Sequence, residues 1–332
     1  MSRYMPPEWA RHSATWMGFP VGAYPGAGVS DDEVQQVWAA VANIIVDHEP
    51  VHMLCPRGQW SRAKRLLSAQ ISLHEYPLND AWLRDTGPTF VIDDGVLRAV
   101  DWRFNGWGDH TAFDWQDDAA IASFIAQQQG VAPSSSALTN EGGGIHVDGA
   151  GTVLLTETVQ LDPQRNPSWS KAQVESEIHG QLGTDRAIWL PRGLHRDYSD
   201  HGTRGHVDIV ACFTPDHTVL LHQQPDQGHP DYPLYAQVQE QLNDAGYSVR
   251  PLQAPTVLRD NRDWVDYSYI NHYVCNGAVV MPTFKDPMDD AAAEVLRDSY
   301  PGRDIRQVDA RVIFAMGGGV HCITQQQPAV AA

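Results

Sequence analysis

Apolar residues recur at helical spacing in several stretches of the chain, and short β-rich runs separate these stretches. The clearest helical pattern is Asp31–His48, where apolar side chains fall on one face and Ser30 is placed to cap the first turn. Weaker helical patterns cover Asp117–Gln128, Ser170–Leu182, Tyr232–Ala245 and Met288–Ser299. Runs such as Thr152–Thr156 and Val279–Met281 have the composition of strands. The pattern therefore predicts an α/β protein in which strands and helices alternate.

Internal repetition is visible in the β-rich part of the pattern. Segments that open with a similar step from polar to apolar residues are Glu141–Glu157, Gly205–His222 and Tyr269–Pro282. Their starts lie about 60 residues apart, a spacing typical of closed or stacked arrays. We expect roughly five ββαβ-like units that form one domain over residues 1–332, with exposed loops at Pro133–Ser136 and Pro225–Pro233.

The composition is that of a globular protein, and the charge is acidic. Hydrophobic residues make up 42% of the 332 residues and charged residues 19%, as in ordinary folded domains. The 41 Asp and Glu residues against 23 Lys and Arg give a net charge of -18, which repels nucleic acid and anionic membranes and mildly favours small cations. Residues 1–20 lack the apolar run of a signal peptide, and no stretch approaches the roughly 18–20 apolar residues of a membrane span. We therefore expect a cytoplasmic protein without nucleic-acid or membrane partners.

Neither the cysteines nor a short histidine motif indicates a metal site. Cys55, Cys212, Cys275 and Cys322 are scattered without CxxC spacing, so we expect reduced thiols. The run His48–His52 matches the H-E-x-x-H zinc motif letter by letter. That motif needs both histidines on one helical face, but Pro50 would cost such a helix about 3 kcal/mol, and the residues after it have a strand pattern. We expect no metal and no cofactor.

The segment Met316–Pro328 is the most informative part of the chain for chemistry. Three consecutive glycines precede His321 and Cys322, and glycine both frees the backbone and lets a ligand approach closely. A thiol needs that access to act as a nucleophile. A buried, inert cysteine is the competing interpretation, and we adopt it for the other three cysteines.

Two further segments carry polar groups suited to a cationic ligand. In Gly205–Asp208, the side chains of His206 and Asp208 would share one face if the segment were a strand. In the turn-rich segment Asn79–Pro88, Asp85 and Trp82 offer a carboxylate and an aromatic face, which together suit a planar cation. The competing interpretations are a structural His–Asp pair in the first segment and, in the second, an aspartate that pairs with Arg84 or caps a turn through Thr86.

A third such segment is Asn140–His146, where Glu141 stands beside three glycines. The glycines free the backbone next to a carboxylate, although a tight structural bend would explain them equally well. Local reasoning from the residues leaves these alternatives open.

Taken together, these segments resemble the agmatine deiminase family, within the superfamily of guanidino-group modifying enzymes that includes arginine and peptidyl-arginine deiminases. The matching segments span nearly the whole chain: Met5–Trp9, Ala14–Met17, Asn79–Pro88, Glu141–Gly143, Gly205–Asp208 and His321–Pro328. The resemblance implies a pentein-like fold, a five-bladed α/β propeller of pseudo-symmetric ββαβ units around a central site. It also implies a homodimer.

The resemblance implies roles for individual residues. Cys322 would be the nucleophile, His206 the general acid and base, and Asp85 and Asp208 the carboxylates that clamp a guanidinium group. Glu141 would be a further acidic residue of the site, and Trp82 would line the pocket against the substrate.

The implied activity is hydrolytic deimination of a small cationic guanidino substrate. Agmatine would give N-carbamoylputrescine and ammonia through a covalent amidino-thioether on Cys322, without a metal. An amidinotransferase or an arginine or peptidyl-arginine deiminase could use the same fold and the same Cys–His pair. A catalytically inactive guanidine-binding protein is the alternative that is not an enzyme, but it would lack Cys322 or His206.

The chain departs from the family pattern at two places beside the expected site. Family members often carry an acidic and Asn-containing run before the Gly-His-Val-Asp motif, whereas this chain has Asp200–Arg204 there. Typical members also have Asn and Ile between the glycines and the His–Cys pair, where this chain has only Val320. Both differences bear on the substrate more than on the chemistry.

Overall fold

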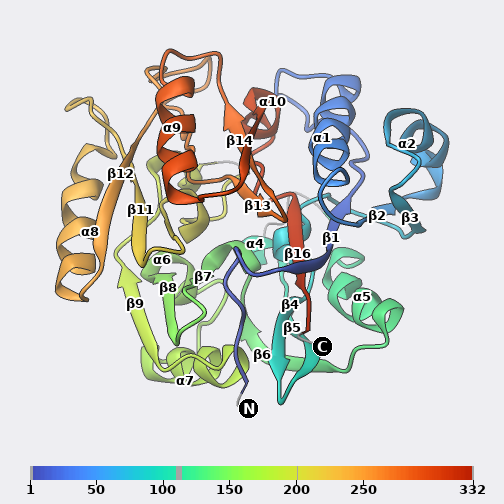
Figure 1. The fold of residues 1–332 in the computed structure, drawn as a ribbon, viewed down its shortest axis with the longest axis horizontal. Helices are drawn as coiled ribbons and strands as arrows, with labels where there is room; N and C mark the ends of the chain where they lie inside the picture. Colours follow the sequence, from blue (N-terminus) through green and yellow to red (C-terminus); the bar gives the residue numbers. More distant parts are fainter. Residues whose placement is uncertain (1–2, 110–113, 200, 331–332) are drawn as a thin grey trace.

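The strands of this computed structural model, which describes residues 3–109, 114–199 and 201–330, form five sheets (Figure 1). Four of the sheets share one plan: an antiparallel hairpin, a helix, and a third strand parallel to the second strand of the hairpin. In chain order these units are β4 (Thr89–Asp93), β5 (Val96–Arg103), α5 (Ile121–Gln129) and β6 (Pro133–Thr139); β7 (Ile145–Val147), β8 (Thr152–Thr156), α7 (Lys171–Leu182) and β9 (Arg186–Leu190); β10 (Ala211–Phe213), β11 (Thr218–Gln223), α8 (Tyr232–Asp244) and β12 (Ser248–Gln253); and β13 (Tyr273–Cys275), β14 (Ala278–Thr283), α9 (Asp289–Ser299) and β15 (Asp304–Asp309). This is the ββαβ order that the sequence predicted.

The fifth sheet is assembled from both ends of the chain. Its strands and helices are β16 (Thr324–Pro328), β1 (His12–Gly18), α1 (Asp31–Ile45), β2 (Val51–Cys55), α2 (Trp60–Leu66) and β3 (Ser72–Glu75). Strand β16 pairs antiparallel with β1, and β2 pairs parallel with β1. The buried indole of Trp16 on β1 donates a hydrogen bond to the side chain of Gln327 on β16 at 2.9 Å. The hairpin, helix and parallel strand of the other units therefore recur here, with the hairpin split between the two termini.

Helix α1 begins at Asp31, as the sequence predicts, but it ends three residues before the predicted end at His48. Ser30 accepts a hydrogen bond from the backbone of Glu33, and Glu33 bonds back to the backbone of Ser30, which forms a capping box. The helix ends at Ile45, and β2 begins at Val51. The segment His48–His52 is therefore not helical, which confirms that the apparent zinc motif is coincidental. Within the described residues, no group of three or more His, Cys, Asp or Glu side chains is arranged to hold a metal ion.

One loop prediction was wrong. The segment Pro133–Ser136, expected to be an exposed loop, is the start of β6, which pairs with β5 at the edge of its sheet. An edge strand tolerates a proline at its first residue, and it can leave polar side chains in solvent, so its pattern resembles that of a loop. The other predicted loop, Pro225–Pro233, does lead into α8, which begins at Tyr232.

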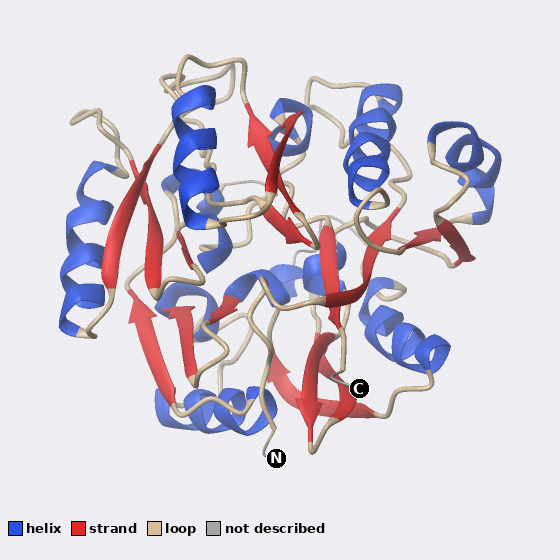
Figure 2. Ribbon diagram, in the orientation of Figure 1, coloured by secondary structure: helices blue, strands red, loops and turns tan. Residues whose placement is uncertain are grey.

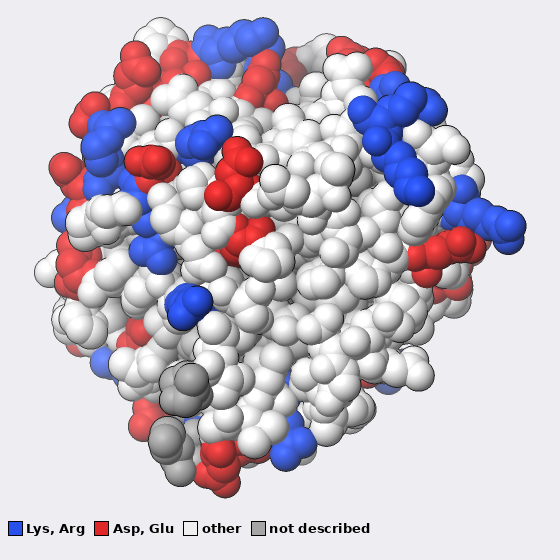
Figure 3. Space-filling model, turned by 45° about the vertical axis from the view of Figure 1, so that its right-hand side comes forward, with Lys and Arg blue, Asp and Glu red and all other residues white. Residues whose placement is uncertain are grey.

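The longer helices lie at the periphery and the sheets lie inside them (Figures 1 and 2). The short helices are α3 (Leu83–Thr86), α4 (Gly106–Asp109), α6 (Glu157–Gln160) and α10 (Arg311–Ala315), and the 3-10 turns are η1 (Arg57–Gln59), η2 (Asp118–Ala120), η3 (Gly142–Gly144), η4 (His195–Tyr198) and η5 (Val207–Ile209). On the face shown in Figure 3, acidic and basic side chains intermingle around a broad uncharged area. The described helices include none that is long and apolar enough to cross a membrane.

Candidate active site

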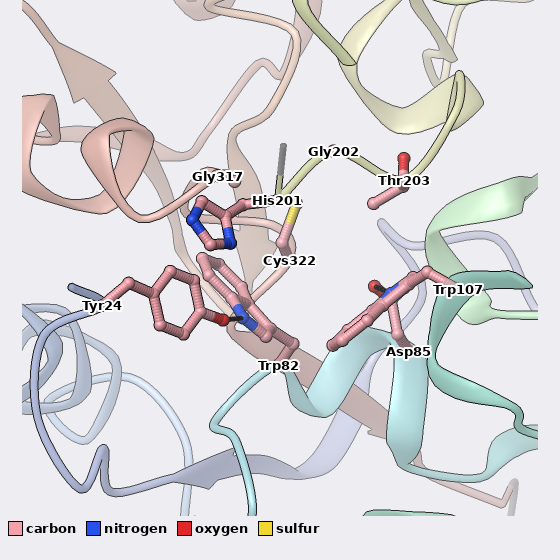
Figure 4. Close-up of a pocket in the computed structure, with 10 residues that line it drawn as sticks. Tyr24, Trp82, Asp85, Trp107, His201, Gly202, Thr203, Gly317 and Cys322 are labelled. Atoms are coloured by element: carbon pink, nitrogen blue, oxygen red, sulfur yellow. Dashed lines mark hydrogen bonds between the residues drawn. The ribbon is translucent and has the colours of Figure 1, made fainter. Parts of the chain in front are cut away.

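A pocket lies where several loops meet, and Figure 4 shows its lining. The lining residues are Tyr24, Trp82, Asp85, Trp107, His201, Gly202, Thr203, Gly317, Gly318 and Cys322. The thiol of Cys322 lies between Trp82 on one side and Trp107 with Asp85 on the other (Figure 4). Three of the residues singled out in the sequence, Trp82, Asp85 and Cys322, therefore face one space.

The glycines before Cys322 allow the close packing that the sequence suggested. A Cβ atom on Gly318 would lie 2.6 Å from the ring of Trp82 and 3.3 Å from the Cβ of Cys322. The indole of Trp82 is fixed in turn, because its Nε1 donates to the hydroxyl of Tyr24 at 2.8 Å and its ring packs edge-on against Trp38. The glycine loop therefore places the thiol against a rigid aromatic wall.

The thiol itself lies beside polar groups. Its Sγ is 3.5 Å from Oδ2 of Asp208 and accepts a hydrogen bond from the side-chain amide of Asn271 at 3.3 Å. Burial and the charges of Asp208 and Asp85 raise the pKa of Cys322 well above its usual range. Burial also raises the pKa of Cys55, to about 11, and of Cys275, to about 12. Position in the pocket, and not acidity, distinguishes Cys322.

Asp85 points into the site from helix α3. Its Oδ1 accepts the backbone N–H of Gly143 at 3.0 Å, and its Oδ2 accepts the indole N–H of Trp107 at 2.9 Å. Arg84 turns the other way and donates to Gln326. The alternative roles, pairing with Arg84 or capping through Thr86, are therefore not seen. Burial raises the pKa of Asp85, although the nearby His206 opposes this effect.

His206 and Asp208 reach the site from a turn, so the strand prediction for this segment was wrong. Residues Val207–Ile209 form the 3-10 turn η5, and strand β10 begins only at Ala211. Gly205 has a φ of 113°, which few other residues adopt. Asp197 accepts the backbone N–H groups of both Gly205 and His206 and so holds the turn.

The imidazole of His206 is placed between two carboxylates. Its Nε2 donates to Oε2 of Glu141 at 3.1 Å, and its Nδ1 lies 3.7 Å from Oδ1 of Asp85. Among the described residues, none forms a hydrogen bond with Nδ1. Burial disfavours the charged ring, but Asp85 and Glu141 outweigh burial and raise the pKa of His206 to about 9. At neutral pH the ring is therefore an imidazolium.

Glu141 is fully buried behind His206 and does not line the pocket. Arg165 donates to both of its oxygens, at 2.9 and 3.1 Å. Burial alone would raise the pKa of Glu141, but Arg165 and His206 lower it to about 2. The glycines after Glu141 are needed for space, because a Cβ on Gly143 would lie 2.5 Å from Nδ1 of His206. This close approach explains the triglycine that the sequence left open.

Asp208 is held by a chain of charged groups that reaches back to the N-terminal segment. Nδ1 of His321 donates to Oδ2 of Asp208 at 2.8 Å, and its Nε2 donates to Oε1 of Glu8 at 2.7 Å. An imidazole that donates through both nitrogens is protonated. Burial and Arg84 oppose that charge, but Glu8 and Asp208 raise the pKa of His321. His321 thus orients the carboxylate that lies beside the thiol.

Several residues of the site were not found by sequence reasoning. Glu8 lies within Met5–Trp9, which matched the family without an assigned role. Trp107 has a left-handed backbone (φ 56°) between two glycines, and that Gly-Trp-Gly run was a signal for a strained functional turn. Arg165 and Asn271 had no local signal, because their contacts are made only in the folded chain.

The chain is similar to known proteins both in sequence and in fold. A family model described as Porphyromonas-type peptidyl-arginine deiminase matches residues 4–328. The chain is 52% identical to a Streptomyces coelicolor protein that is provisionally named agmatine deiminase, over 99% of each chain. It is 38% identical to the agmatine deiminase of Stutzerimonas stutzeri, over 98% of this chain and 95% of that protein. The fold matches a structure of agmatine deiminase from Enterococcus faecalis with a TM-score of 0.91 and 30% identity, over 99% of this chain and 97% of the other.

Proposed function

This chain belongs to the Porphyromonas-type peptidyl-arginine deiminase family, and we propose that it hydrolyses agmatine to N-carbamoylputrescine and ammonia. The observation that carries the proposal is that Cys322 and Asp85 line one pocket together with aromatic rings, while Asp208 lies 3.5 Å from the thiol and Nδ1 of His206 lies 3.7 Å from Asp85. Relatives named agmatine deiminase that align over almost the full length support this substrate.

The two aspartates would bind the guanidinium of the substrate. A carboxylate accepts two N–H groups of a guanidinium through charge-assisted hydrogen bonds. Asp208 lies 3.5 Å from the thiol, so a guanidinium on this carboxylate would bring its central carbon to the sulfur. The rings of Trp82 and Trp107 flank this position and suit the faces of a planar cation (Figure 4).

The substrate would also help to form the nucleophile. The charges of Asp208 and Asp85 oppose ionisation of the Cys322 thiol. A guanidinium held by those carboxylates offsets their charge next to the sulfur and so favours the thiolate. Because His206 is already protonated, the thiol proton passes to solvent water, and the thiolate then forms a bond to the guanidinium carbon.

His206 would move the protons of both steps. Its Nε2 is bonded to Glu141, so Nδ1 is the atom that faces the reacting groups. As an imidazolium it protonates the departing nitrogen when the carbon–nitrogen bond breaks, and ammonia leaves an amidino-thioether on Cys322. The neutral ring then takes a proton from water as the water attacks the same carbon. The carbon–sulfur bond breaks and releases the urea product and the thiolate.

Further expectations go with this function. We propose that the five sheets form the blades of an α/β propeller within one domain; the shared ββαβ order supports this arrangement. An arginine or peptidyl-arginine deiminase and an amidinotransferase are the competing activities for the same four side chains. Cytoplasmic location, the homodimer and the absence of a cofactor stay predictions.

The test is ammonia release from agmatine by the purified chain and by Cys322→Ser. We expect turnover by the wild type, and loss of turnover with retained agmatine binding in the variant, because the carboxylate pair survives. Cys275→Ala, which alters a core thiol, is the control and should stay active. Arginine and an arginine peptide are the comparison substrates. Agmatine hydrolysis by Cys322→Ser at a tenth of the wild-type rate, a barrier change of only about 1.4 kcal/mol, would rule out covalent catalysis.

A further inference from the structure

Glu8 is the far end of the chain of charged groups that holds Asp208, and it is not among the described residues that line the pocket. Its side chain is buried, and it comes from the segment before strand β1. Its Oε1 accepts Nε2–H of His321 at 2.7 Å, and Nδ1 of the same ring donates to Oδ2 of Asp208 at 2.8 Å. The thiol of Cys322 lies 3.5 Å from this Oδ2. One imidazole therefore separates a carboxylate of the N-terminal segment from the carboxylate beside the nucleophile.

The groups packed around Glu8 fix its charge. Nη1 of Arg84, on helix α3, lies 3.5 Å from Oε1. Nε2 of His146, on strand β7, lies 3.7 Å from Oε2, and Nδ1 of this ring accepts the backbone N–H of Phe213. Burial would raise the pKa of Glu8, but His321 and Arg84 lower it well below its usual range. Glu8 is therefore a carboxylate, and it accepts a proton from His321 in their hydrogen bond.

Four buried charges meet around His321: the carboxylates of Glu8 and Asp208, the imidazolium itself and the guanidinium of Arg84. The nearby ring of His272, before β13, is neutral, because burial lowers its pKa to about 4. Without the charge of Glu8, two buried cations would face one carboxylate, and a buried charge without a partner is costly. His321 can relieve that cost by losing its proton, whereas an arginine cannot.

The proton on His321 matters for the state of Asp208. Burial opposes the ionised form of Asp208, but the hydrogen bond and the charge of His321 outweigh burial and lower the pKa of this carboxyl. The charges of His206 and Arg84 act in the same direction, and Asp85 is the neighbouring carboxylate. A guanidinium needs Asp208 in its ionised form, because a protonated carboxyl group offers a donor where the cation needs an acceptor. Loss of the His321 proton would therefore weaken substrate binding.

We propose that Glu8 is a positioning residue for the reaction: it keeps His321 an imidazolium, which in turn holds Asp208 as the oriented carboxylate that binds the guanidinium. This inference rests on the proposed deimination of agmatine. Glu8 acts only through His321, as Glu141 acts through His206. Two buried glutamates thus charge two imidazoles, one for binding and one for proton transfer.

The experiment compares the wild type with Glu8→Gln, which keeps the shape of the side chain but removes its charge. Nitrogen NMR of isotope-labelled histidine rings reads the protonation of His321 directly, and His321→Gln assigns the signal. We expect a charged His321 ring in the wild type at neutral pH. In Glu8→Gln the ring should lose its proton at lower pH than in the wild type.

Steady-state kinetics on agmatine supply the second measurement. We expect Glu8→Gln to lower kcat/KM at least about tenfold at neutral pH, more through KM than through kcat. The acid side of the kcat/KM profile, which reports the free enzyme, should move to higher pH, because Asp208 then titrates beside Asp85. The alkaline limit that His206 sets should stay in place.

Glu49→Gln is the matched control. Glu49 is also a buried glutamate paired with a histidine, since Nδ1 of His12 lies 3.1 Å from its Oε1. The other nitrogen of His12 bonds to the backbone carbonyl of Glu8 instead of its carboxylate. Glu49→Gln should therefore lower the thermal stability, without changing the protonation of His321 or the shape of the pH profile.

Three results would overturn the proposal. A neutral His321 ring in the wild type would show that Glu8 does not charge it, and this measurement holds even if Glu8→Gln fails to fold. A ring that stays equally charged in Glu8→Gln would assign the proton to Asp208 alone. Equal losses in kcat and kcat/KM, with the acid side unmoved, would make Glu8 structural. Failure of the proposed function looks different, because the wild type would release no ammonia from agmatine while the NMR difference between the two proteins remained.

Discussion

Burial and neighbouring charges determine whether each titratable side chain of the site is protonated. Burial and the nearby carboxylates keep the thiol of Cys322 protonated, and the carboxylates also keep the ring of His206 charged. That distribution suits departure of the amine, since the acid is already protonated, but it leaves the nucleophile neutral. Binding of a cationic substrate favours ionisation of the Cys322 thiol and leaves His206 protonated. A neutral analogue of the same shape would lack this effect.

The charge of His206 gives the reaction a pH limit on the alkaline side. The pKa of the ring is raised to about 9, so the imidazolium is fully present at neutral pH and is lost as the pH rises through about 9. We expect kcat/KM for agmatine to fall above that pH. Glu141→Gln should move the limit to lower pH, because Glu141 helps to raise the pKa of His206. A pH–rate profile measures this shift, and an alkaline limit that stays in place would assign the limit to another group.

A second prediction at the residue scale concerns the carboxylate of Asp85. Both of its oxygens accept protein N–H groups, so Asp85→Asn directs an amide N–H against Trp107 or Gly143 and also removes the charge that binds the guanidinium. We expect a loss of at least about 100-fold in kcat/KM, since a charge-assisted pair is worth more than a neutral hydrogen bond. Asp208→Asn should have a similar effect. The measurement is steady-state kinetics on agmatine.

Controls separate the charge of Asp85 from its contacts. Trp107→Phe removes one donor but keeps the carboxylate, and it should cost less than Asp85→Asn. Asp290→Asn, on the exposed face of α9, should be silent. Asp80, in the same loop, is unsuitable as a control because it bonds to the hydroxyl of Tyr24, which lines the pocket. Near wild-type efficiency of Asp85→Asn on agmatine would remove Asp85 from the clamp.

At the scale of elements, regular helices were predictable and short turns were not. An amphipathic period with a capping residue marks α1 and α7, because both signals are local. The segment around His206 carries an apolar run like a strand, but Asp197 and Gly205 turn it into η5. Asp197 lies several residues upstream, and its contacts with the turn depend on the folded loop.

Part of the site could be predicted, because places where the backbone tolerates only glycine are visible in the sequence. The triglycines before Cys322 and after Glu141 are such places, because in both a Cβ would collide with a site residue. Arg165 and Asn271 could not be predicted, because nothing in the local sequence distinguishes them from any other arginine or asparagine in a loop. Their partners belong to other loops, so the pairing is a property of the tertiary structure.

The prediction at the scale of elements concerns Gly318 and the loop that carries Cys322. A Cβ there would lie 2.6 Å from the ring of Trp82, which Tyr24 and Trp38 hold in place, so Gly318→Ala should displace the loop that carries Cys322. We expect a loss of about tenfold or more in kcat/KM, in line with the sensitivity of catalysis to small displacements. Gly58→Ala, which meets no atom within 4 Å, is the control. Thermal unfolding would show whether the loss is local, and unchanged kinetics would mean that the loop adapts.

At the scale of the whole molecule, each of the five sheets contributes to the site from the same place. Asp85 precedes β4, Glu141 precedes β7, Asp208 precedes β10, Asn271 precedes β13 and Cys322 precedes β16. Each residue stands just before the first strand of its unit's hairpin. Repetition of one unit thus brings five loops to one place, and divergence of those loops gives each a different side chain. Sequence identity between the units is too low to reveal this correspondence without the structure.

Because of the fifth unit, the site depends on strand β16, which follows the last site residue, Cys322. All five residues of β16 are buried, and its side chains bind other parts of the molecule: Gln326 accepts from Arg84, and Gln325 donates to the carbonyl of Pro88. A chain that ends at Ile323 keeps every proposed catalytic residue but loses the strand that pairs with β1. Its site loops would then lack their common support.

We therefore expect the chain that ends at Ile323 to show no agmatine hydrolysis and no cooperative thermal transition, whereas a chain that ends at Ala329 should match the full-length protein. Strand β1 would be left with an unpaired edge, and the buried guanidinium of Arg84 would lose the hydrogen bond that it donates to the side-chain oxygen of Gln326. Circular dichroism during heating and an ammonia assay measure both effects. An active, cooperatively folding chain without β16 would show that the four complete units hold the site without closure by the two termini.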